Sequence, residues 1–525
     1  MNNELIKGTL ILSFATVVIR ILGSIFRIPL QNIAGDEVVG IFSLVYPVYM
    51  VILTLSVAGI PVAISKMISE ANTLGKKGEI YKIYKSALFL SLIFGFTSFL
   101  LIMVFSDHIV RLMGGESVRL SLIIVSITLL IAPYMAVYRG YFQGFENMNP
   151  TAVSQMLEQF VRVLFILIIA NVMVKRGYEP DMISGGIMIS SFVGAGLSLL
   201  YLRYLFFVSP LKPKKEVEFR FADFLQMSKR ILYISLPICI GAITMALINF
   251  VDSFTIPVSL IHSGFSEKDI PYLYGIYGRG IALVQIANFF SSSIVLPLIP
   301  LISKSIAQQD WNKVSTLTEK THYYVHLISW PTGFGMFALT LPINLAFFKD
   351  LQGSDMLAVF HLSAVFMSLT LLGTGILQGM NKEKLAAQII VSSVLLKIAT
   401  NFLFIKWLGL LGAAYSTLFV YFVIFVVNSY FIWKVKSFVF WRKQNNSIVF
   451  ASLVMAGVVG IPTLLLNISD WSRMGTLLYL LGSLAAAVIV YAIVLLLTKG
   501  ISKEDLKEMP IVNKLIGKMD LRGKS

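Results

Sequence analysis

The chain has 525 residues, of which 57% are hydrophobic and only 13% are charged, and its formal net charge is +16. Soluble domains carry about 25% charged residues. Together with a mean hydropathy of +0.82, this composition excludes a soluble globular protein and predicts a polytopic membrane protein.

Apolar runs long enough to cross a bilayer recur along the chain. They predict an all-α fold with about fourteen transmembrane helices, at 8–30, 39–64, 86–106, 120–138, 151–173, 182–202, 231–255, 275–300, 324–348, 356–379, 385–405, 411–433, 447–467 and 475–498. The segments between them are short, which leaves no room for a soluble catalytic domain.

The basic residues are distributed unevenly between the two sides of the membrane. With a cytoplasmic N-terminus, the inner segments carry 30 Lys and Arg and the outer segments carry 8. This bias places both termini in the cytoplasm. The positive charge is therefore mainly a topology signal, and no nucleic-acid partner is expected.

Two parts of the chain echo each other. Gln143 in "FQGFENMNPTAVSQ" lies nineteen residues before Arg162, and Gln378 in "LQGMNKEKLAAQ" lies nineteen before Lys397. This similarity could be a coincidence among apolar segments. The favoured interpretation is an internal repeat, which predicts two parallel six-helix lobes with a substrate site between them. The expected parts are lobes at 1–210 and 228–434, two appended helices at 447–498 and a cytoplasmic amphipathic tail at 499–525.

The first span, "ATVVIRILGSIFRIPL" (15–30), carries Arg20 and Arg27 seven residues apart, on one helix face. An arginine at the centre of a membrane helix costs roughly 2.5–3.5 kcal/mol by insertion scales. The span offers no acid, and Asp36 and Glu37 follow only after its end. An intramembrane cation without a local partner indicates a functional site, so we expect both arginines to face a ligand.

Other spans carry polar residues as well. In the fifth span Glu158 and Arg162 are spaced for an intrahelical ion pair. In the seventh, Asn249 and Asp252 share a face and could bind a coupling ion. Arg279 in the eighth span and Lys397 in the eleventh are further candidate substrate contacts.

A purely structural role is the alternative interpretation of these charges. Arg162 could simply neutralise Glu158. Asp252 could likewise neutralise Arg279, and Lys397 could be a paired packing residue. Even so, five intramembrane cations face only two acids, and a surplus near +3 suits an anionic substrate. Arginine's planar fork matches phosphate oxygens.

The motifs "RILGSIFR" and "YFQGFENMNPTAVSQMLEQFVR" are similar to those of a known transporter group. With the fourteen-helix plan, they resemble the polysaccharide-biosynthesis branch of the multidrug/oligosaccharidyl-lipid/polysaccharide exporter superfamily. Within this branch the resemblance is to the stage V sporulation protein B and MurJ lipid II flippase group.

This resemblance implies a cavity that opens alternately to either side of a bacterial cytoplasmic membrane and carries an undecaprenyl-pyrophosphate-linked saccharide outward. The family's cavity arginines correspond to Arg20, Arg27 and Arg279, and Glu37 falls near a functional acid. The last two helices would line a groove for the lipid tail. Lipid II and a role in peptidoglycan synthesis, cell shape or sporulation are the leading expectation.

Two departures from the family pattern affect single residues. A second-span arginine has no counterpart in "LVYPVYMVILTL", and small or apolar residues flank Arg279 in "IYGRGIALVQ". Arg162 and Lys397 could supply the missing charge.

Several functions stay open. The cargo could be another polysaccharide repeat unit, or the chain could be a cation-coupled multidrug antiporter, although an antiporter for organic cations should show excess acid. A lipid-dependent glycosyltransferase would need acids in a sizeable outer loop. We therefore expect no enzyme, no catalytic residue, no metal site and no cofactor, with transport by a monomer driven by the membrane potential or by Na⁺ or H⁺.

Overall fold

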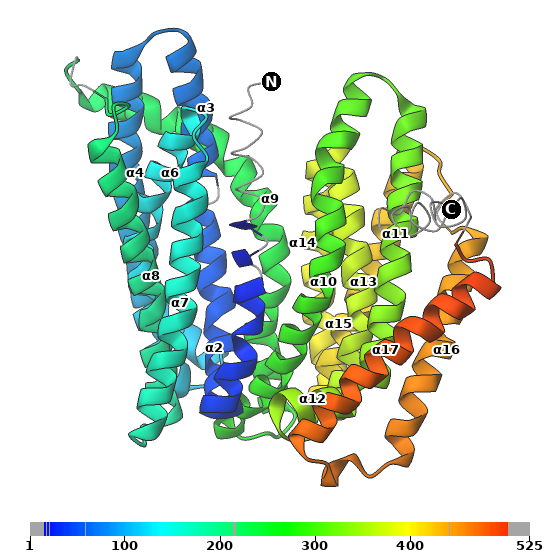
Figure 1. The fold of residues 1–525 in the computed structure, drawn as a ribbon. Helices are drawn as coiled ribbons and strands as arrows, with labels where there is room; N and C mark the ends of the chain where they lie inside the picture. Colours follow the sequence, from blue (N-terminus) through cyan, green and yellow to red (C-terminus); the bar gives the residue numbers. More distant parts are fainter. Residues whose placement is uncertain are drawn as a thin grey trace, which may run out of the picture. The chain divides into compact units, whose positions relative to one another are not determined.

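The structure, a computed structural model, describes residues 15–16, 18–19, 21–57, 59–213, 217–439 and 441–501. All regular elements in these ranges are helices (Figure 1). The predicted tail beyond residue 501 lies outside the described residues, as does Arg20. The all-helical prediction is confirmed.

The chain divides into two compact units. The first unit comprises Met1–Ile286 and Glu383–Val420, and the second comprises Ala287–Lys382 and Tyr421–Ser525. These divisions differ from the predicted lobe boundaries, which stay a prediction.

Nine α-helices and three short 3-10 helices of the described chain belong wholly to the first unit: α2 (Arg27–Val57), α3 (Ile60–Thr73), α4 (Lys77–Leu112), η1 (Glu116–Val118), α5 (Arg119–Ile127), η2 (Thr128–Leu130), α6 (Ala132–Gly144), α7 (Asn149–Lys175), α8 (Pro180–Val208), α9 (Phe221–His262), η3 (Glu267–Asp269) and α14 (Glu383–Leu408). Two helices contribute to both units: α10 (Ile270–Ala307) and α15 (Leu410–Val435). The described helices of the second unit are α11 (Trp311–Ala338), α12 (Thr340–Phe348), α13 (Ser354–Gly379), α16 (Lys443–Leu465), η4 (Ile468–Asp470) and α17 (Arg473–Leu497).

Within the described residues, 11 helical segments are long and apolar enough to cross a membrane, or 12 if α11 and α12 form one bent span. The predicted count of fourteen is not confirmed. The predicted spans 8–30 and 39–64 meet in one helical stretch, Ile21–Thr73, and α9 contributes only a shorter apolar helix, Ala246–His262. The predicted span 324–348 is bent by 75° between α11 and α12.

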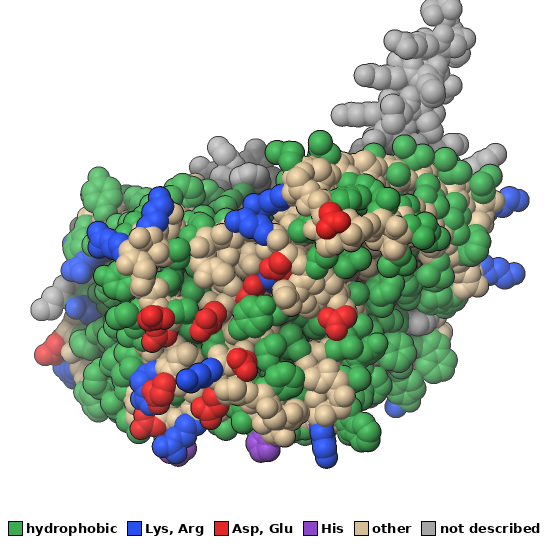
Figure 2. Space-filling view, turned by 90° about the horizontal axis from the view of Figure 1, so that it is seen from below, with side chains coloured by type: hydrophobic (Ala, Val, Ile, Leu, Met, Phe, Trp, Pro, Cys, Tyr) green, Lys and Arg blue, Asp and Glu red, His purple; other side chains and the backbone are tan. Residues whose placement is uncertain are grey.

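The outer faces of many helices are apolar. Large exposed side chains include Leu101 and Val104 on α4 and Leu478 and Leu481 on α17. Hydrophobic side chains cover much of the surface in Figure 2, while acidic side chains gather on the face turned toward the viewer. A water-soluble protein rarely exposes so much apolar surface, so lipid is the solvent that these helices require.

Helix α9 begins before its predicted apolar run, and polar contacts hold its first turn. At the start of α9, the Asp223 carboxylate accepts hydrogen bonds from Lys82 Nζ at 2.7 Å and from the Arg220 backbone N–H at 3.0 Å. These bonds, that from Lys82 first, hold the pKa of Asp223 below its ordinary value. The helix can therefore begin at Phe221, ten residues before the predicted span.

The backbones of α2 and α10 approach each other closely at two glycines, an arrangement that we call the α2–α10 crossing. Helix α2 is broken at Gly35, whose φ of 81° favours glycine. Beyond the break, a Cβ on Gly40 would lie 1.7 Å from the Pro271 carbonyl oxygen. A Cβ on Gly275 would lie 1.9 Å from the carbonyl oxygen of Asp36. Only glycine fits at either position.

The first prediction concerns this crossing. Gly40→Ala should lower the thermal unfolding midpoint of the purified protein, because overpacking costs typically about 1–3 kcal/mol and here the obstacle is backbone. Gly196→Ala is the matched control, since a Cβ there meets nothing within 4 Å. Equal midpoints for the two variants would contradict the close approach.

Candidate functional site

Arg27, at the start of α2, is a buried cation with no acidic partner among the described residues. It is 6% exposed, and its Nε and Nη1 atoms have no hydrogen-bond partner there. Its Cζ lies 5.8 Å from the centroid of the Phe42 ring. A cation–π contact contributes about 0.5–2 kcal/mol but satisfies no N–H donor. Arg27 therefore keeps at least two donors free for a ligand.

Arg279, on α10, is paired with Asp36, which follows the break at Gly35. The Arg279 Nε donates to Asp36 Oδ1 at 2.7 Å, and Nη2 contacts Oδ2 of the same carboxylate. Gln31 Nε2 also donates to Asp36 Oδ2, at 3.2 Å. This is a bidentate guanidinium–carboxylate pair, a strong and directional contact. It lies beside the α2–α10 crossing, because Gly275 contacts the backbone of Asp36.

Glu158, on α7, is shared by two arginines. Arg162 Nη2 lies 2.7 Å from Glu158 Oε1, which confirms the predicted intrahelical pair. Arg139 Nη2 lies 2.8 Å from Oε2, and Arg139 also donates to the hydroxyls of Ser154 and Ser198. The triad keeps one positive charge in excess, and Arg162 Nε is buried without a partner in the described chain.

Arg139 was not among the predicted site residues. The predicted span ended at residue 138, so Arg139 was assigned to a cytoplasmic segment. In the structure α6 continues to Gly144 and Arg139 is buried. The run "YRGYFQG" could have located it, because no proline follows residue 138 in this run to end the helix before Arg139.

Asp252, on α9, is paired with Lys397 on α14. The Lys397 Nζ lies 3.3 Å from Asp252 Oδ1, and the two side chains are 0% and 2% exposed. The alternative that Asp252 neutralises Arg279 is wrong, because Asp36 takes that place. Helix packing decides the pairing, since α14 packs against α9 within the first unit.

The remaining predicted residues are less enclosed. Glu37 and Asn249 are partly buried, and the backbone oxygen of Asn249 accepts a hydrogen bond from Ser253.

With Arg139 and Asp36 added to the predicted set, the described interior of the first unit holds five cations and three acids. The cations are Arg27, Arg139, Arg162, Arg279 and Lys397, and the acids are Asp36, Glu158 and Asp252. Arg20 adds one further cation by sequence, so the surplus stays near +3.

A model of the family described as "Polysaccharide biosynthesis protein" matches residues 5–306. The chain belongs to this family. It is 27% identical over 537 residues to stage V sporulation protein B of Bacillus subtilis (strain 168). This alignment covers 97% of this chain and 98% of that protein. It is 24% identical over 522 residues to the lipid II flippase MurJ of the same organism, which covers 93% of each.

The fold is also that of solved members of the superfamily. The structure "Lipid II flippase MurJ, inward closed conformation" matches with a TM-score of 0.69 at 18% identity, over 92% of this chain and 98% of that one. The resemblance inferred from the first-span and "FQGFENMNPTAVSQ" motifs is confirmed, and the family members it points to are transporters rather than enzymes.

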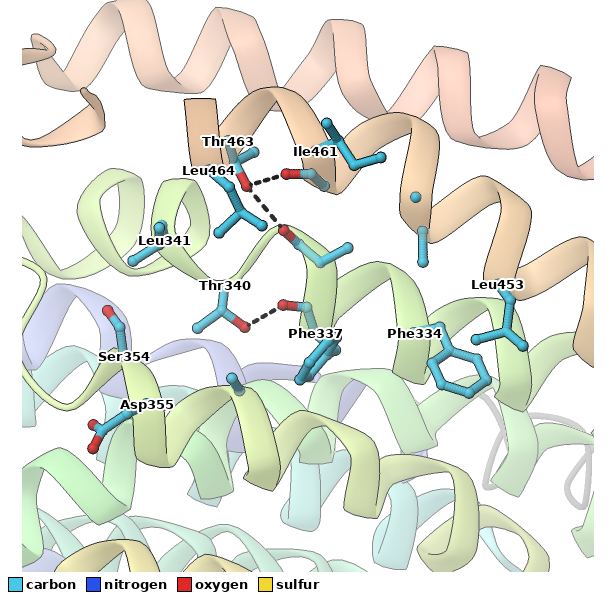
Figure 3. A pocket seen from close by; sticks show the side chains of 15 residues that line it. Phe334, Phe337, Thr340, Leu341, Ser354, Asp355, Leu453, Ile461, Thr463 and Leu464 are labelled. Atoms are coloured by element: carbon cyan, nitrogen blue, oxygen red, sulfur yellow. Dashed lines mark hydrogen bonds between the residues drawn. The ribbon is translucent and has the colours of Figure 1, made fainter. Parts of the chain in front are cut away.

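The second unit of this family member contains an apolar pocket of about 520 Å³. Figure 3 shows Phe334 and Phe337 of α11 facing it from one side and Leu453 of α16 from another. Ser354 and Asp355, at the start of α13, are polar residues of its lining. The resemblance implied a tail groove along the last two helices; of these, α16 lines the pocket and none of the lining residues comes from α17.

The second prediction concerns the Asp36–Arg279 pair. Asp36→Ala and Arg279→Ala should each destabilise the protein, by about 3–5 kcal/mol, because each removes one member of a buried, hydrogen-bonded charge pair. The double variant should lose less than the sum of the two. Unfolding midpoints of the three variants in one detergent show how strongly the Asp36 and Arg279 side chains are coupled.

Asp107→Ala is the control for this experiment. It removes an exposed partner of Arg119, and surface pairs contribute only about 0–1 kcal/mol. Additive losses at Asp36 and Arg279, or a loss as large at Asp107, would contradict a buried, coupled pair.

Proposed function

We propose that this chain is an alternating-access flippase that moves a lipid-linked saccharide from the inner to the outer leaflet of the bacterial cytoplasmic membrane. The proposed carrier lipid is undecaprenyl pyrophosphate, and the leading cargo is lipid II. The protein acts as a monomer with both termini in the cytoplasm. Flippases of lipid-linked saccharides among its relatives support the class of cargo.

The observation that carries the proposal is the state of Arg27. A buried guanidinium with two unsatisfied N–H groups is costly unless a ligand completes it. A pyrophosphate supplies several anionic oxygens that accept from a guanidinium in a bidentate geometry. The predicted companion, Arg20, would extend the same cationic face.

The sign of the interior charge argues against a drug antiporter for organic cations. The acids that such a cargo would need are already bound: Asp36 to Arg279, Asp252 to Lys397 and Glu158 to two arginines. The remaining free charge is positive, which favours an anionic cargo.

The apolar pocket of the second unit supports a lipid-linked cargo. Its wall is mostly aromatic and aliphatic, and a Cβ on Gly457 would meet nothing within 4 Å. A polyprenyl segment is the part of the proposed cargo that suits such a wall.

Complementation tests the cargo. The chain should restore growth of bacteria depleted of their own lipid II flippase. Failure there, together with rescue of a strain that lacks a capsule or O-antigen repeat-unit flippase, would reject lipid II and retain the shared pyrophosphate chemistry.

The third prediction concerns Arg27. Arg27→Ala should lower the rate of lipid II flipping in proteoliposomes at least about tenfold, because one charge-assisted hydrogen bond contributes about 1.5–3 kcal/mol. Arg27→Lys should recover only part of the rate, since a point charge cannot make the bidentate contact. The readout is protection of fluorescent lipid II from a membrane-impermeant quencher.

Arg203→Ala is the matched control. Arg203 also lies over a phenylalanine ring, with its Cζ 5.5 Å from the centroid of Phe207, but it is exposed. Its removal should leave the rate unchanged. A full rate in Arg27→Ala, or equal losses in the two variants, would contradict the proposed contact.

The fourth prediction concerns the driving force. Return of an empty carrier with a surplus near +3 is favoured by a potential that is negative inside, by about 2.3 kcal/mol per full charge per 100 mV. Bound pyrophosphate cancels much of that charge, so the loaded step is opposed less. Collapse of the potential at constant pH and sodium should therefore leave the protein mainly outward-facing.

Cysteine labelling can report this state. Ser43 is buried on α2, and its hydroxyl lies 3.0 Å from a Cβ placed on Gly278, beside the α2–α10 crossing. In a Cys239→Ala background, Ser43→Cys should react with an impermeant reagent from outside only when the crossing opens. Labelling that ignores the potential and responds to sodium removal instead would reject this mechanism.

A further inference from the structure

The Lys397–Asp252 pair lies within a larger buried network of the first unit. Helices α9, α10, α14 and α15 each contribute side chains to it. The Lys397 Nζ donates to Thr417 Oγ1 at 2.6 Å. Tyr277 donates to Asp252 Oδ2 at 2.9 Å, and Asn401 Nδ2 donates to Asp252 Oδ1 at 2.8 Å. All five side chains are nine-tenths or more buried.

The Lys397 ammonium contacts two oxygens, Asp252 Oδ1 and Thr417 Oγ1, and Tyr277 and Asn401 bind the same carboxylate. A carboxylate, a threonine hydroxyl, a tyrosine hydroxyl and an amide are the ligand types that hard cations prefer. Coupling cations of secondary transporters bind inside the membrane, near its midplane. Apart from the lysine, the network is therefore a set of ligands that suits a small monovalent cation.

One oxygen of this set is unused. Asn401 donates from Nδ2 to Asp252 and to Thr255 Oγ1 at 2.7 Å, which fixes the orientation of its amide. The Oδ1 atom of Asn401 is buried and has no hydrogen-bond partner among the described residues. A buried carbonyl without a donor is unfavourable, so the network has one acceptor that its own donors do not satisfy.

We propose that the Lys397 ammonium is a resident cation at a site whose oxygens would otherwise bind Na⁺. Its charge neutralises Asp252, and its tether keeps it in place at every sodium concentration. Asp252 is thus closed to a soluble coupling ion, and removal of the ammonium alone would open a sodium site. The site itself is independent of the cargo; only its consequence for the driving force rests on the proposed function.

Two substitutions at one position separate this role from simple helix packing. Lys397→Ala removes the ammonium and its stem, so it leaves both space and oxygens for an ion. Lys397→Met removes the charge but fills the space with an unbranched apolar chain. Both leave Asp252 unpaired, so they differ mainly in whether an ion can enter.

The experiment is a thermal unfolding titration of the full-length protein in detergent, with NaCl exchanged for KCl or choline chloride at constant ionic strength. The unmodified chain should unfold at the same temperature in all three salts. Lys397→Ala should unfold earlier in choline chloride and recover a few degrees, saturably, with NaCl, because a ligand that binds only the folded state stabilises it. Lys397→Met, and Lys397→Ala combined with Asp252→Asn, should show no such recovery.

Two results would overturn the proposal. One is a Lys397→Ala protein that folds and responds equally to NaCl and choline chloride. The other is a sodium-specific rise in the unfolding temperature of the unmodified chain. This second measurement can be made even if Lys397→Ala and its substitute Lys397→Ser do not fold. Neither result depends on transport, so failed complementation would reject the proposed function and leave this inference standing.

Discussion

The cost of holding an ionised side chain away from water governs how the helices of the first unit pack. A buried charge stripped of its partner costs several kcal/mol, whereas a well-formed pair offsets much of its desolvation. Each described acid of the interior is therefore bound to a cation from another part of the chain or of its own helix. Asp36 joins α2 to α10, Glu158 joins α7 to α6, and Asp252 joins α9 to α14. These pairs fix which helix turns face each other.

The same rule separates the charges available to a ligand from those that hold the protein together. Arg279 and Lys397 each have a carboxylate partner, so a substrate would have to compete with that carboxylate. Their part in substrate binding stays a prediction. Within the described part of the chain, Arg27 has the aromatic face of Phe42 beside it and no acid paired with it. A ligand with anionic oxygens gains the most binding free energy at a cation that has no carboxylate partner in the protein. The free positive charge of the described interior thus lies at Arg27 and in the excess of the Glu158 triad.

Close backbone approach makes one of these pairs possible. Side chains at positions 40 and 275 would hold α2 and α10 apart, and Arg279 could then not reach Asp36 with both Nε and Nη2. The break at Gly35 has a complementary effect, because it places Asp36 at the start of a new helical segment. Glycine and charge act together here: the glycines permit the contact, and the pair gives it specificity. A transporter that opens at this place must release both.

The sequence by itself determined the class of the protein, the helical nature of its segments and the local pair of Glu158 with Arg162. It also identified Arg27 as a cation without an acid in its own predicted span. These features depend on hydropathy and on the 3.6-residue period, which are local properties. Only the tertiary structure decided that Arg279 binds Asp36, 243 residues away, and that Lys397 binds Asp252. It alone brought Arg139 into the triad and showed α11 and α12 as a bent pair. The reason is physical: several acids are equally plausible partners for a cation in sequence, and the choice among them follows from which backbones can approach each other.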